Sequence, residues 1–412
     1  METLILLVLF IIFAGAKLAG EICRRLHQPS VIGEIIFGML LGPLLLKLAG
    51  DAHTHEVFTE TLNVFAEIGV IILLFVVGLE TRISEMLRVG RTALAVAISG
   101  VILPFGLGLA LMLGLHQQVD VALFIATALV ATSVGITARV LSELRQTASR
   151  PALVILGAAV IDDILGLIVL SIVSGISDGQ LSAFSIGLTI VEAAAFTVFV
   201  LFIGGRAAHR VSAHFSRLRI AQPAFVIPIA LCLGLSALAA HIGLAAIVGA
   251  FLAGMVFAET KEAPTIQRSM DEVYALMVPI FFVVMGTKVD IYSFARPEVL
   301  ILGLMVTLLA IIGKVVGCGL AAYKLGRQEA AVVGIAMMPR GEVGIVVASI
   351  GLSRGIINDD IYSIVIFMSI ITTLIAPPLL RLALSQPKKA SHPALQSASE
   401  SAPPPDAPPA PQ

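Results

Sequence analysis

The chain alternates between long apolar stretches and short polar connections as far as about residue 384. Each stretch has roughly the 17–25 residues that an α-helix needs to cross the hydrocarbon core of a bilayer. The pattern therefore predicts an all-α polytopic membrane protein. Thirteen transmembrane helices are predicted, at residues 3–20, 31–49, 62–79, 92–115, 121–141, 152–176, 185–205, 222–240, 242–258, 273–289, 299–323, 329–352 and 361–384.

Composition supports this class and excludes others. Hydrophobic residues make up 58% of the 412 residues, charged residues only 13%, and the mean hydropathy is +1.03. A soluble enzyme does not need so much apolar material, so we expect no enzyme. A net charge of −1 argues against a nucleic-acid partner. The three cysteines and eight histidines show no disulfide or metal spacing, and we expect no cofactor.

The end of the chain has a different composition. Residues 385–412 are rich in proline, alanine and serine, which cannot bury a core, and we expect a disordered tail there. Residues 1–384 are then the transmembrane domain.

Lysine and arginine are distributed unevenly among the predicted connections. The connections after odd-numbered spans, together with the tail, hold 19 of these residues, whereas those after even-numbered spans hold 4. The positive-inside rule then places the C-terminus in the cytoplasm and the N-terminus outside. Thirteen spans, an odd number, likewise put the two ends on opposite sides.

Two polar interruptions lie at matching places in the pattern. ATSVGIT at 131–137 and MPRGEVG at 338–344 each fall inside an apolar span, and Thr132 and Pro339 are 207 residues apart. Spans 1–6 and 8–13 are therefore predicted to form an inverted repeat, with span 7 as the linker. Interrupted helices in inverted halves indicate a transporter with its site where the breaks meet. The alternative is that both clusters are only small-residue contacts between helices.

Asp162 and Asp163 are adjacent inside an apolar span, where a charge is costly. On a helix they project about 100° apart, so we expect two different partners. Lys314, flanked by the glycines of a G-x-x-x-G notch, is the best candidate partner for one of them. The other could alternate between a proton and a metal cation, with oxygens of Thr132 and Ser133 completing a transient Na⁺ shell. The alternative for the Asp162–Lys314 pair is a purely structural ion pair.

Other charges lie within or beside the spans. Arg340 and Glu342 flank the break in span 12, where they can neutralise each other or stabilise the ends of the half-helices. Glu34 and Glu67 lie near span ends and are expected to reach the headgroups, with a role as charges of an entry funnel as the alternative. Lys288 is expected to form a surface pair with Asp290.

Six segments together resemble the cation:proton antiporter-2 family, and most closely its NapA-type sodium/proton antiporters. They are ATSVGITARVL (131–141), ILGAAVIDDILGLIVL (155–170), GLAAIVGAFLAGM (243–255), FFVVMGTKVD (281–290), GKVVG (313–317) and MPRGEVGIV (338–346).

This resemblance implies thirteen helices with two unwound, crossing helices, and a homodimer. It implies that a core bundle, about 92–176 and 299–384, moves like an elevator against a dimerisation bundle. Asp163 would carry the ion or proton, and Asp162 would pair with Lys314, which can release a second proton. An Asp-Asp pair resembles the electrogenic members, which exchange two protons per sodium. The absence of Gln-Asp disfavours the potassium-efflux branch.

The sequence thus favours an antiporter in a bacterial inner membrane that exchanges cytoplasmic Na⁺ (Li⁺) for external H⁺ and serves sodium and pH homeostasis. Exchange of K⁺ or NH₄⁺ on the same fold is the main alternative. A channel and a sodium-coupled solute symporter are rivals from other classes, and a channel would tolerate loss of Asp163.

Overall fold

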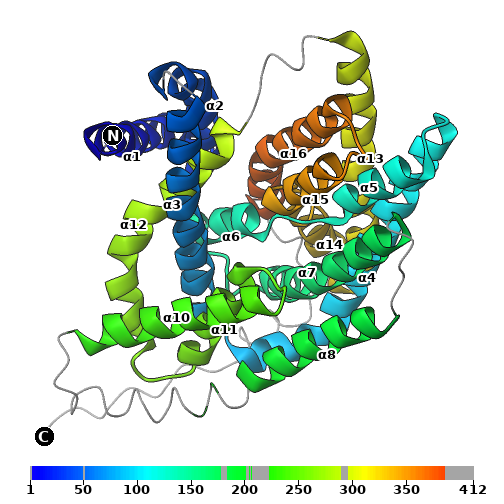
Figure 1. Ribbon diagram of the computed structural model, residues 1–412. Coiled ribbons are helices and arrows are strands. Elements are labelled where there is room, and N and C mark those ends of the chain that lie inside the picture. Colours follow the sequence, from blue (N-terminus) through cyan, green and yellow to red (C-terminus); the bar gives the residue numbers. More distant parts are fainter. Residues whose placement is uncertain are drawn as a thin grey trace, which may run out of the picture.

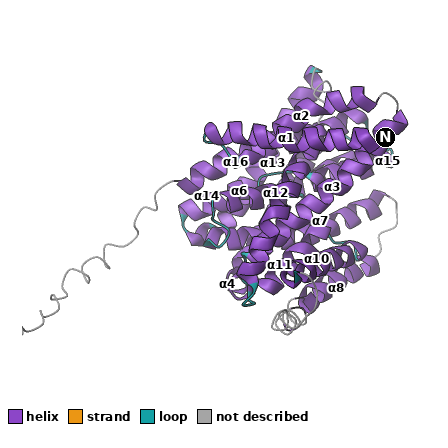
Figure 2. Cartoon of the chain, turned by 90° about the vertical axis from the view of Figure 1, so that its left-hand side faces the viewer, coloured by secondary structure: helices purple, strands orange, loops and turns teal. Residues whose placement is uncertain are grey.

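The computed structural model describes residues 2–49, 52–177, 183–200, 222–288 and 296–385, with Gly204 and Arg206 in addition. These residues form helices joined by short connections (Figure 2). The α-helices are α1 (Glu2–Arg25), α2 (Ser30–Ala49), α3 (Ala52–Leu79), α4 (Ile83–Gly114), α5 (Val119–Val130), α6 (Val134–Glu143), α7 (Arg150–Ser177), α8 (Ala183–Phe199), α10 (Pro223–His241), α11 (Ala246–Ala258), α12 (Ala263–Thr287), α13 (Pro297–Ala321), α14 (Arg327–Ala336), α15 (Glu342–Ser353) and α16 (Asp359–Ser385).

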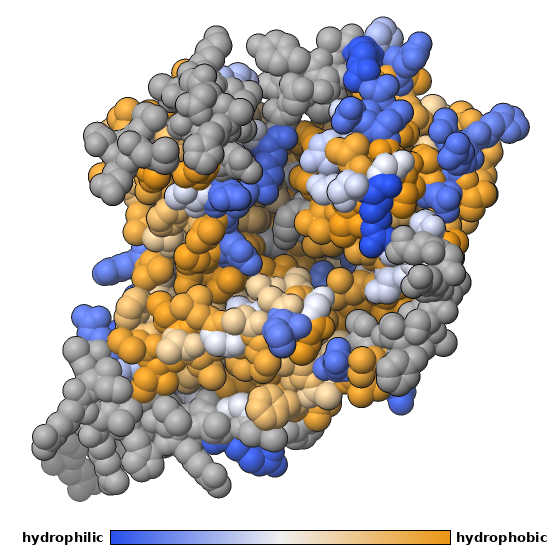
Figure 3. All heavy atoms as spheres, in the orientation of Figure 1, coloured by the Kyte–Doolittle hydropathy of each residue, from blue (hydrophilic) through white to orange (hydrophobic). Residues whose placement is uncertain are grey.

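Nine helices in the described part of the chain are long and apolar enough to cross a membrane, counting α5 and α6 together. Four shorter apolar helices accompany them. Broad apolar areas cover the face shown in Figure 3, as expected for a surface that contacts lipid. The protein is therefore an all-helical, multi-pass membrane protein, and the count of thirteen spans stays a prediction.

The predicted and observed elements differ chiefly at their ends. The span predicted at 273–289 belongs to a helix that starts at Ala263, because α12 also includes the polar residues that precede the apolar stretch. The span predicted at 242–258 begins later, at Ala246, because Gly243 takes a positive φ of 82° between α10 and α11. The tail, apart from Ser385, lies outside the described residues.

The helices pack as two groups, which lie on opposite sides of Figure 1. Bundle 1 consists of α1, α2, α3, α10, α11 and α12. Bundle 2 consists of α4–α7 and α13–α16. α6 lies between them and contacts both α2 and α3 of bundle 1.

Glycines let the helices of bundle 1 approach very closely. A Cβ at Gly254 of α11 would lie 2.1 Å from the carbonyl oxygen of Phe75 on α3, and one at Gly286 of α12 would lie 2.2 Å from that of Ile35 on α2. Close backbone contact of this kind is the main source of packing energy between helices in lipid. Bundle 1 is therefore built as a tight, rigid unit.

Candidate ion-binding site

The adjacent aspartates lie at the middle of α7. Asp162 is 2% exposed, whereas Asp163 is only partly buried. The two carboxylates face different surroundings because successive side chains on a helix diverge by about 100°.

Asp162 forms an ion pair with Lys314 of α13. Lys314 Nζ donates to both carboxylate oxygens, at 3.0 and 3.2 Å, and its side chain is fully buried. Each charge is costly to bury alone, and each is compensated by the other. The pair thus holds two opposite charges in the middle of bundle 2 with almost no access for water.

Small residues make the room for this pair. Cβ atoms at Gly313 and Gly317 would lie 2.9 Å from Pro104 Cα and 2.8 Å from the Ser99 carbonyl oxygen, both on α4. A Cβ at Gly100 of α4 would lie 3.2 Å from Lys314 Nζ. The G-x-x-x-G notch therefore brings α13 against α4 at the level of the buried lysine.

The two interruptions seen in the sequence are helix breaks that meet in space. One separates α5 from α6 at 131–133, and the other separates α14 from α15 at 337–341. The Ser133 N–H donates to the Pro339 carbonyl oxygen at 2.9 Å, and Thr137 Oγ1 donates to the Ala336 carbonyl oxygen at 2.5 Å. Backbone groups that lose their helical partners are thus partly satisfied by the opposite break.

Arg340 fastens the crossing together. Its fully buried guanidinium donates to the carbonyl oxygens of Ala131 at 2.7 Å, Val130 at 3.3 Å and Ala310 at 3.4 Å. These contacts place a positive charge at the negative, C-terminal end of α5. The Thr373 hydroxyl in turn donates to the Arg340 carbonyl oxygen at 2.7 Å.

The remaining predicted site residues lie at the same crossing. Thr132 and Ser133 are buried, and the Thr132 hydroxyl oxygen accepts a long, 3.5 Å contact from Arg340. Glu342 is the first residue of α15, and its side chain lies outside what the structure describes. The structure therefore gathers Asp162, Lys314, Thr132, Ser133 and Arg340 in one buried region.

Asp163 borders the largest cavity near this region. The cavity has a volume of about 280 Å³, and its wall includes Thr127, Ala131 and Asp162 from bundle 2 and Gly243–Ala245 from bundle 1. It lies between the two bundles, on the side of the aspartates toward the connection between α10 and α11. The sequence did not single out Thr127, which lies in an apolar helix without a polar pattern. Residues 243–245 begin the segment GLAAIVGAFLAGM, which carried part of the family resemblance but no predicted site role.

On its other side, Asp163 borders a space of only about 10 Å³. The residues around this space are apolar and include Leu74, Leu156 and Phe251. A hydrated cation does not fit there. Asp163 is accordingly reached through the larger cavity and blocked on the opposite side.

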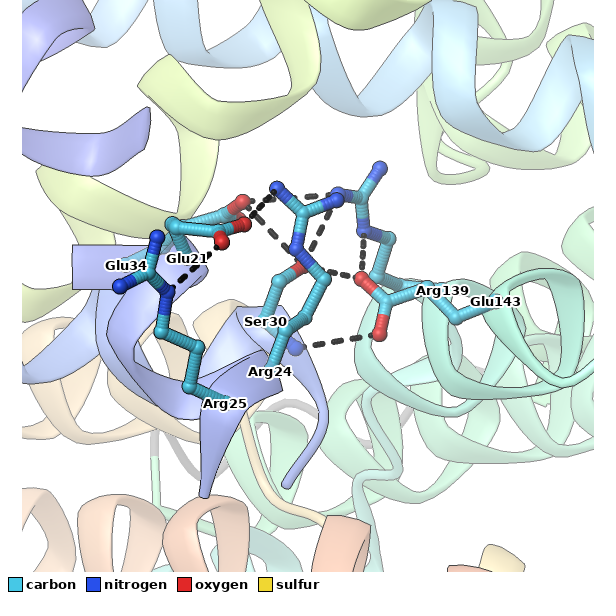
Figure 4. A network of polar contacts seen from close by, with 7 residues as sticks. All are labelled: Glu21, Arg24, Arg25, Ser30, Glu34, Arg139 and Glu143. Carbon is cyan, nitrogen blue, oxygen red and sulfur yellow. Dashed lines mark hydrogen bonds and ion pairs between the residues drawn. The ribbon is translucent and has the colours of Figure 1, made fainter. Parts of the chain in front are cut away.

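A polar network that the sequence analysis missed joins the two bundles (Figure 4). Arg139 of α6 donates to Glu143 at 2.9 Å and to Glu34 of α2 at 3.4 Å. The backbone N–H of Ser30, at the start of α2, donates to Glu143 at 3.1 Å. The expectation that Glu34 reaches the headgroups is wrong, because its side chain is buried against Arg139.

A second polar contact between the bundles involves Glu80, between α3 and α4. It accepts hydrogen bonds from Thr147 at 2.5 Å and from Gln267 of α12 at 3.2 Å. Burial raises the pKa of the Glu80 carboxyl above its ordinary value of 4.5, although the hydrogen bond from Thr147 opposes this.

Comparison with known families identifies this architecture. The family described as "Sodium/hydrogen exchanger, transmembrane" matches residues 7–386. The chain belongs to the sodium/hydrogen exchanger family.

Curated members of this family resemble the chain over nearly its full length. It is 36% identical to a high-affinity Na⁺/H⁺ antiporter, NhaS3, of Synechocystis sp., with 94% of this chain and 92% of the relative covered. It is 33% identical to the Na⁺/H⁺-K⁺ antiporter GerN of Bacillus cereus, with 92% and 96% covered. It is 30% identical to a Na⁺/H⁺ antiporter of Enterococcus hirae, with 91% and 96% covered.

A solved sodium/hydrogen exchanger structure shares the fold. The sodium proton antiporter MjNhaP1 of Methanocaldococcus jannaschii superposes with a TM-score of 0.73 at 18% identity, over 95% of this chain and 100% of that one. This family consists of transporters, and the chain is accordingly a membrane transporter of the Na⁺/H⁺ antiporter type.

Proposed function

We propose that the protein exchanges cytoplasmic Na⁺ or Li⁺ for external H⁺, with Asp163 as the carboxylate that carries either ion. The observation that supports this most is the cavity that borders Asp163 next to the neutralised Asp162–Lys314 pair. A carboxylate cannot hold a proton and a metal cation at once. Competition for Asp163 therefore couples the two fluxes, with no covalent chemistry and no cofactor.

Oxygen ligands for the cation are available at the crossing. Thr132, Ser133 and carbonyl groups of the broken helices offer the hard oxygens that a small alkali cation prefers. In this proposal Arg340 keeps the broken segments in place. The negative charge of Glu342, at the start of α15, stabilises the N-terminal end of that half-helix.

Alternating access follows from the unequal spaces around Asp163. We assign the transport core to about 92–176 and 299–384, with the remaining helices as the dimerisation part of a homodimer. The grouping of helices into two bundles supports this assignment. An elevator-like displacement of one bundle along the other would close the larger cavity and open the apolar side, where Leu74, Leu156 and Phe251 lie.

The orientation and the energetics complete the proposal. With the N-terminus outside, in a bacterial inner membrane, the larger cavity faces the external side. Two protons per sodium would make the cycle electrogenic, and each net charge moved is worth about 2.3 kcal/mol per 100 mV. The proton motive force would then drive sodium extrusion and cytoplasmic pH control.

Exchange of K⁺ (or NH₄⁺) for H⁺ is the second candidate. It is favoured by one observation, the similarity to GerN, whose name includes both Na⁺ and K⁺. An oxygen-lined site for K⁺ differs from one for Na⁺ mainly in its size, so the same residues can serve either cation.

Purified protein in liposomes tests both candidates. We expect Na⁺ and Li⁺ to dissipate an imposed pH gradient, and Asp163→Asn to abolish the response because an amide does not titrate. Asp120→Asn, a change at an exposed aspartate on α5, is the matched control and should transport normally. A response to K⁺ alone would support the second candidate. Unchanged transport in Asp163→Asn would place the carrier elsewhere.

A further inference from the structure

A second, larger cavity lies away from the aspartates, where α1, α2, α6, α12 and α16 meet. Its volume is about 490 Å³, within the range of sites for small organic ligands. Its wall includes Arg24, Ser30, Arg139, Glu143, Tyr274 and Arg381. It does not include Asp162 or Asp163, so it is separate from the proposed transport site.

The wall of this cavity carries excess positive charge. Three arginines from three helices line it with a single carboxylate, Glu143, while two further carboxylates, Glu21 and Glu34, pair with Arg24 and Arg139 without lining it. Such a lining repels Na⁺ and K⁺ and attracts anions. The cavity is therefore unsuited to conduct the transported cation and suited to an anionic ligand.

Of the three arginines, only Arg139 forms ion pairs that are largely buried. Arg139 is buried, donates to Glu143 and Glu34, and lies over the ring of Tyr274, with its Cζ 5.1 Å from the ring centroid. Its charge is balanced by these partners, which are drawn with it in Figure 4.

Arg24 and Arg381 are held more loosely. Arg24 pairs at 3.2 Å with Glu21, where the two side chains are 61% and 46% exposed, and a pair this exposed to water contributes little to stability. Arg381 donates to the carbonyl oxygen of His27, a neutral acceptor. These two guanidiniums can turn to a ligand at little cost.

The same wall already stabilises one anionic group. The carboxylate of Glu143 accepts the Ser30 N–H at the positive, N-terminal end of α2. The N-terminal end of α2, as well as the arginines, thus stabilises negative charge on this part of the cavity wall.

We propose that this cavity binds a phosphate-bearing anion, clamped by Arg24 and Arg381. Arginine suits phosphate because its planar guanidinium forms paired, charge-assisted hydrogen bonds. The ligand is either the headgroup of an anionic lipid or a soluble phosphate compound. The cavity lies at the end where the basic connections gather, which we propose to be cytoplasmic, and basic pockets between helices on that side recruit lipid headgroups.

Binding here would tie the two bundles together. Arg24 belongs to α1 of bundle 1, and Arg381 belongs to α16 of bundle 2. A phosphate held by both arginines stabilises the present arrangement of the bundles. This inference goes beyond the proposed ion exchange, and binding can be measured without any transport.

Thermal unfolding of the full-length protein tests the proposal. The chain has no tryptophan, so unfolding is followed with a thiol-reactive dye that reports exposure of the buried Cys232 and Cys318. N-methyl-D-glucamine phosphate is compared with the chloride salt at equal ionic strength, in the absence of Na⁺ and K⁺. In parallel, phosphatidylcholine nanodiscs are compared with and without phosphatidylglycerol.

Three variants test whether the stabilisation by phosphate or lipid depends on Arg24 and Arg381. We expect saturating ligand to raise the Tm of the wild type by about 2–4 °C. Arg24→Gln should reduce this rise, and Arg24→Gln/Arg381→Gln should remove it. Arg25→Gln is the matched control, because Arg25 also pairs with Glu21 but does not line the cavity.

The two arms distinguish the sources. A rise with phosphate that follows this pattern assigns a soluble phosphate compound, and a rise with phosphatidylglycerol alone assigns a lipid headgroup. The proposal is overturned if neither probe stabilises the wild type, or if Arg24→Gln and Arg25→Gln behave alike. Native mass spectrometry of Arg24→Gln, a change at an exposed helix end, gives an independent count of bound lipid if the double variant does not fold.

Discussion

Lys314 and Asp162 are almost completely removed from solvent, and each relies on the other to remain charged there. Replacing Lys314 with methionine keeps the apolar bulk but leaves the carboxylate of Asp162 without its partner. We expect a loss of about 3–5 kcal/mol in unfolding free energy, the usual cost of breaking a buried pair. Thermal and denaturant unfolding in detergent would measure it.

The double variant Asp162→Leu/Lys314→Met tests whether the lost stability comes from the unpaired carboxylate of Asp162. Replacing both charges by apolar side chains should recover most of the lost stability, because a buried pair contributes little net energy compared with apolar packing. A double variant as unstable as Lys314→Met alone would contradict this account.

The pair at Asp162 could be predicted from sequence, whereas the one at Arg139 could not. Few charges occur at the middle of an apolar span, so Lys314 was the natural partner for Asp162. Glu34 and Arg139 lie near span ends, where the interface already explains a charge, and 105 residues separate them. Their contact depends on how α6 packs against α2, and no local sequence pattern predicts this packing.

Glu80 gives the fold a pH dependence of predictable sign. Its pKa is higher in the folded protein than the ordinary 4.5, so the folded state binds the proton more tightly than the unfolded state. Its contribution to stability is therefore fully present below pH 4.5 and is lost as the pH rises through the folded pKa. Glu80→Gln should gain stability relative to wild type as the pH increases from 4.5 to 8.

Unfolding temperatures of the two proteins across this pH range check the prediction. The change Glu272→Gln, at an exposed position on α12, serves as the control for replacing a glutamate by glutamine. A difference between Glu80→Gln and wild type that does not change with pH would refute the assignment.

At the scale of elements, the crossing of the two broken helices depends on the absence of a side chain at one position. A Cβ at Gly341 would lie 2.4 Å from Ser133 Oγ and 2.6 Å from Ser133 Cβ. Gly341→Ala should therefore push the breaks apart, lower the Tm and reduce exchange. Gly341→Ala/Ser133→Gly should restore part of the Tm, since it removes the opposing atoms, but not the exchange, because the Ser133 hydroxyl is a proposed cation ligand.

Gly106→Ala, on α4, is the control for the effect of a glycine-to-alanine change away from the crossing. Apart from the neighbouring backbone of its own helix, no atom lies within 4 Å of a Cβ at Gly106, and alanine is favoured over glycine inside a helix by about 1 kcal/mol. We expect this variant on α4 to be as stable as wild type or more stable. Equal loss of activity in both variants would show that the crossing is not the cause.

The helix breaks could be located from sequence, but their contact could not. Clusters such as ATSVGIT and MPRGEVG stand out because threonine, serine, glycine and proline are unusual inside apolar spans. The hydrogen bond from Ser133 to Pro339 and the carbonyl contacts of Arg340 follow from the packing of bundle 2. The start of α12 was misplaced for a related reason, since its polar first turns lack any apolar pattern.

At the scale of the whole molecule, the proposed elevator movement requires contacts between the bundles to break and re-form. The network of Ser30 and Glu34 with Arg139 and Glu143 is such a contact, because α2 belongs to bundle 1 and α6 to bundle 2. Contacts within a bundle, such as that of Gly20 with Ser30, should persist throughout the cycle. A Cβ at Gly20 would lie 3.2 Å from Ser30 Cβ.

Cross-linking tests this difference with one shared cysteine. In a background without reactive native cysteines, we expect a short bismethanethiosulfonate linker between Ser30→Cys and Glu143→Cys to abolish cation-driven proton movement in liposomes. Reduction should restore it. The same linker between Gly20→Cys and Ser30→Cys should leave transport intact, because both residues move together. Full activity with the two bundles linked would show that exchange occurs without their relative displacement, and would leave local motion of the crossing as the means of access to Asp163.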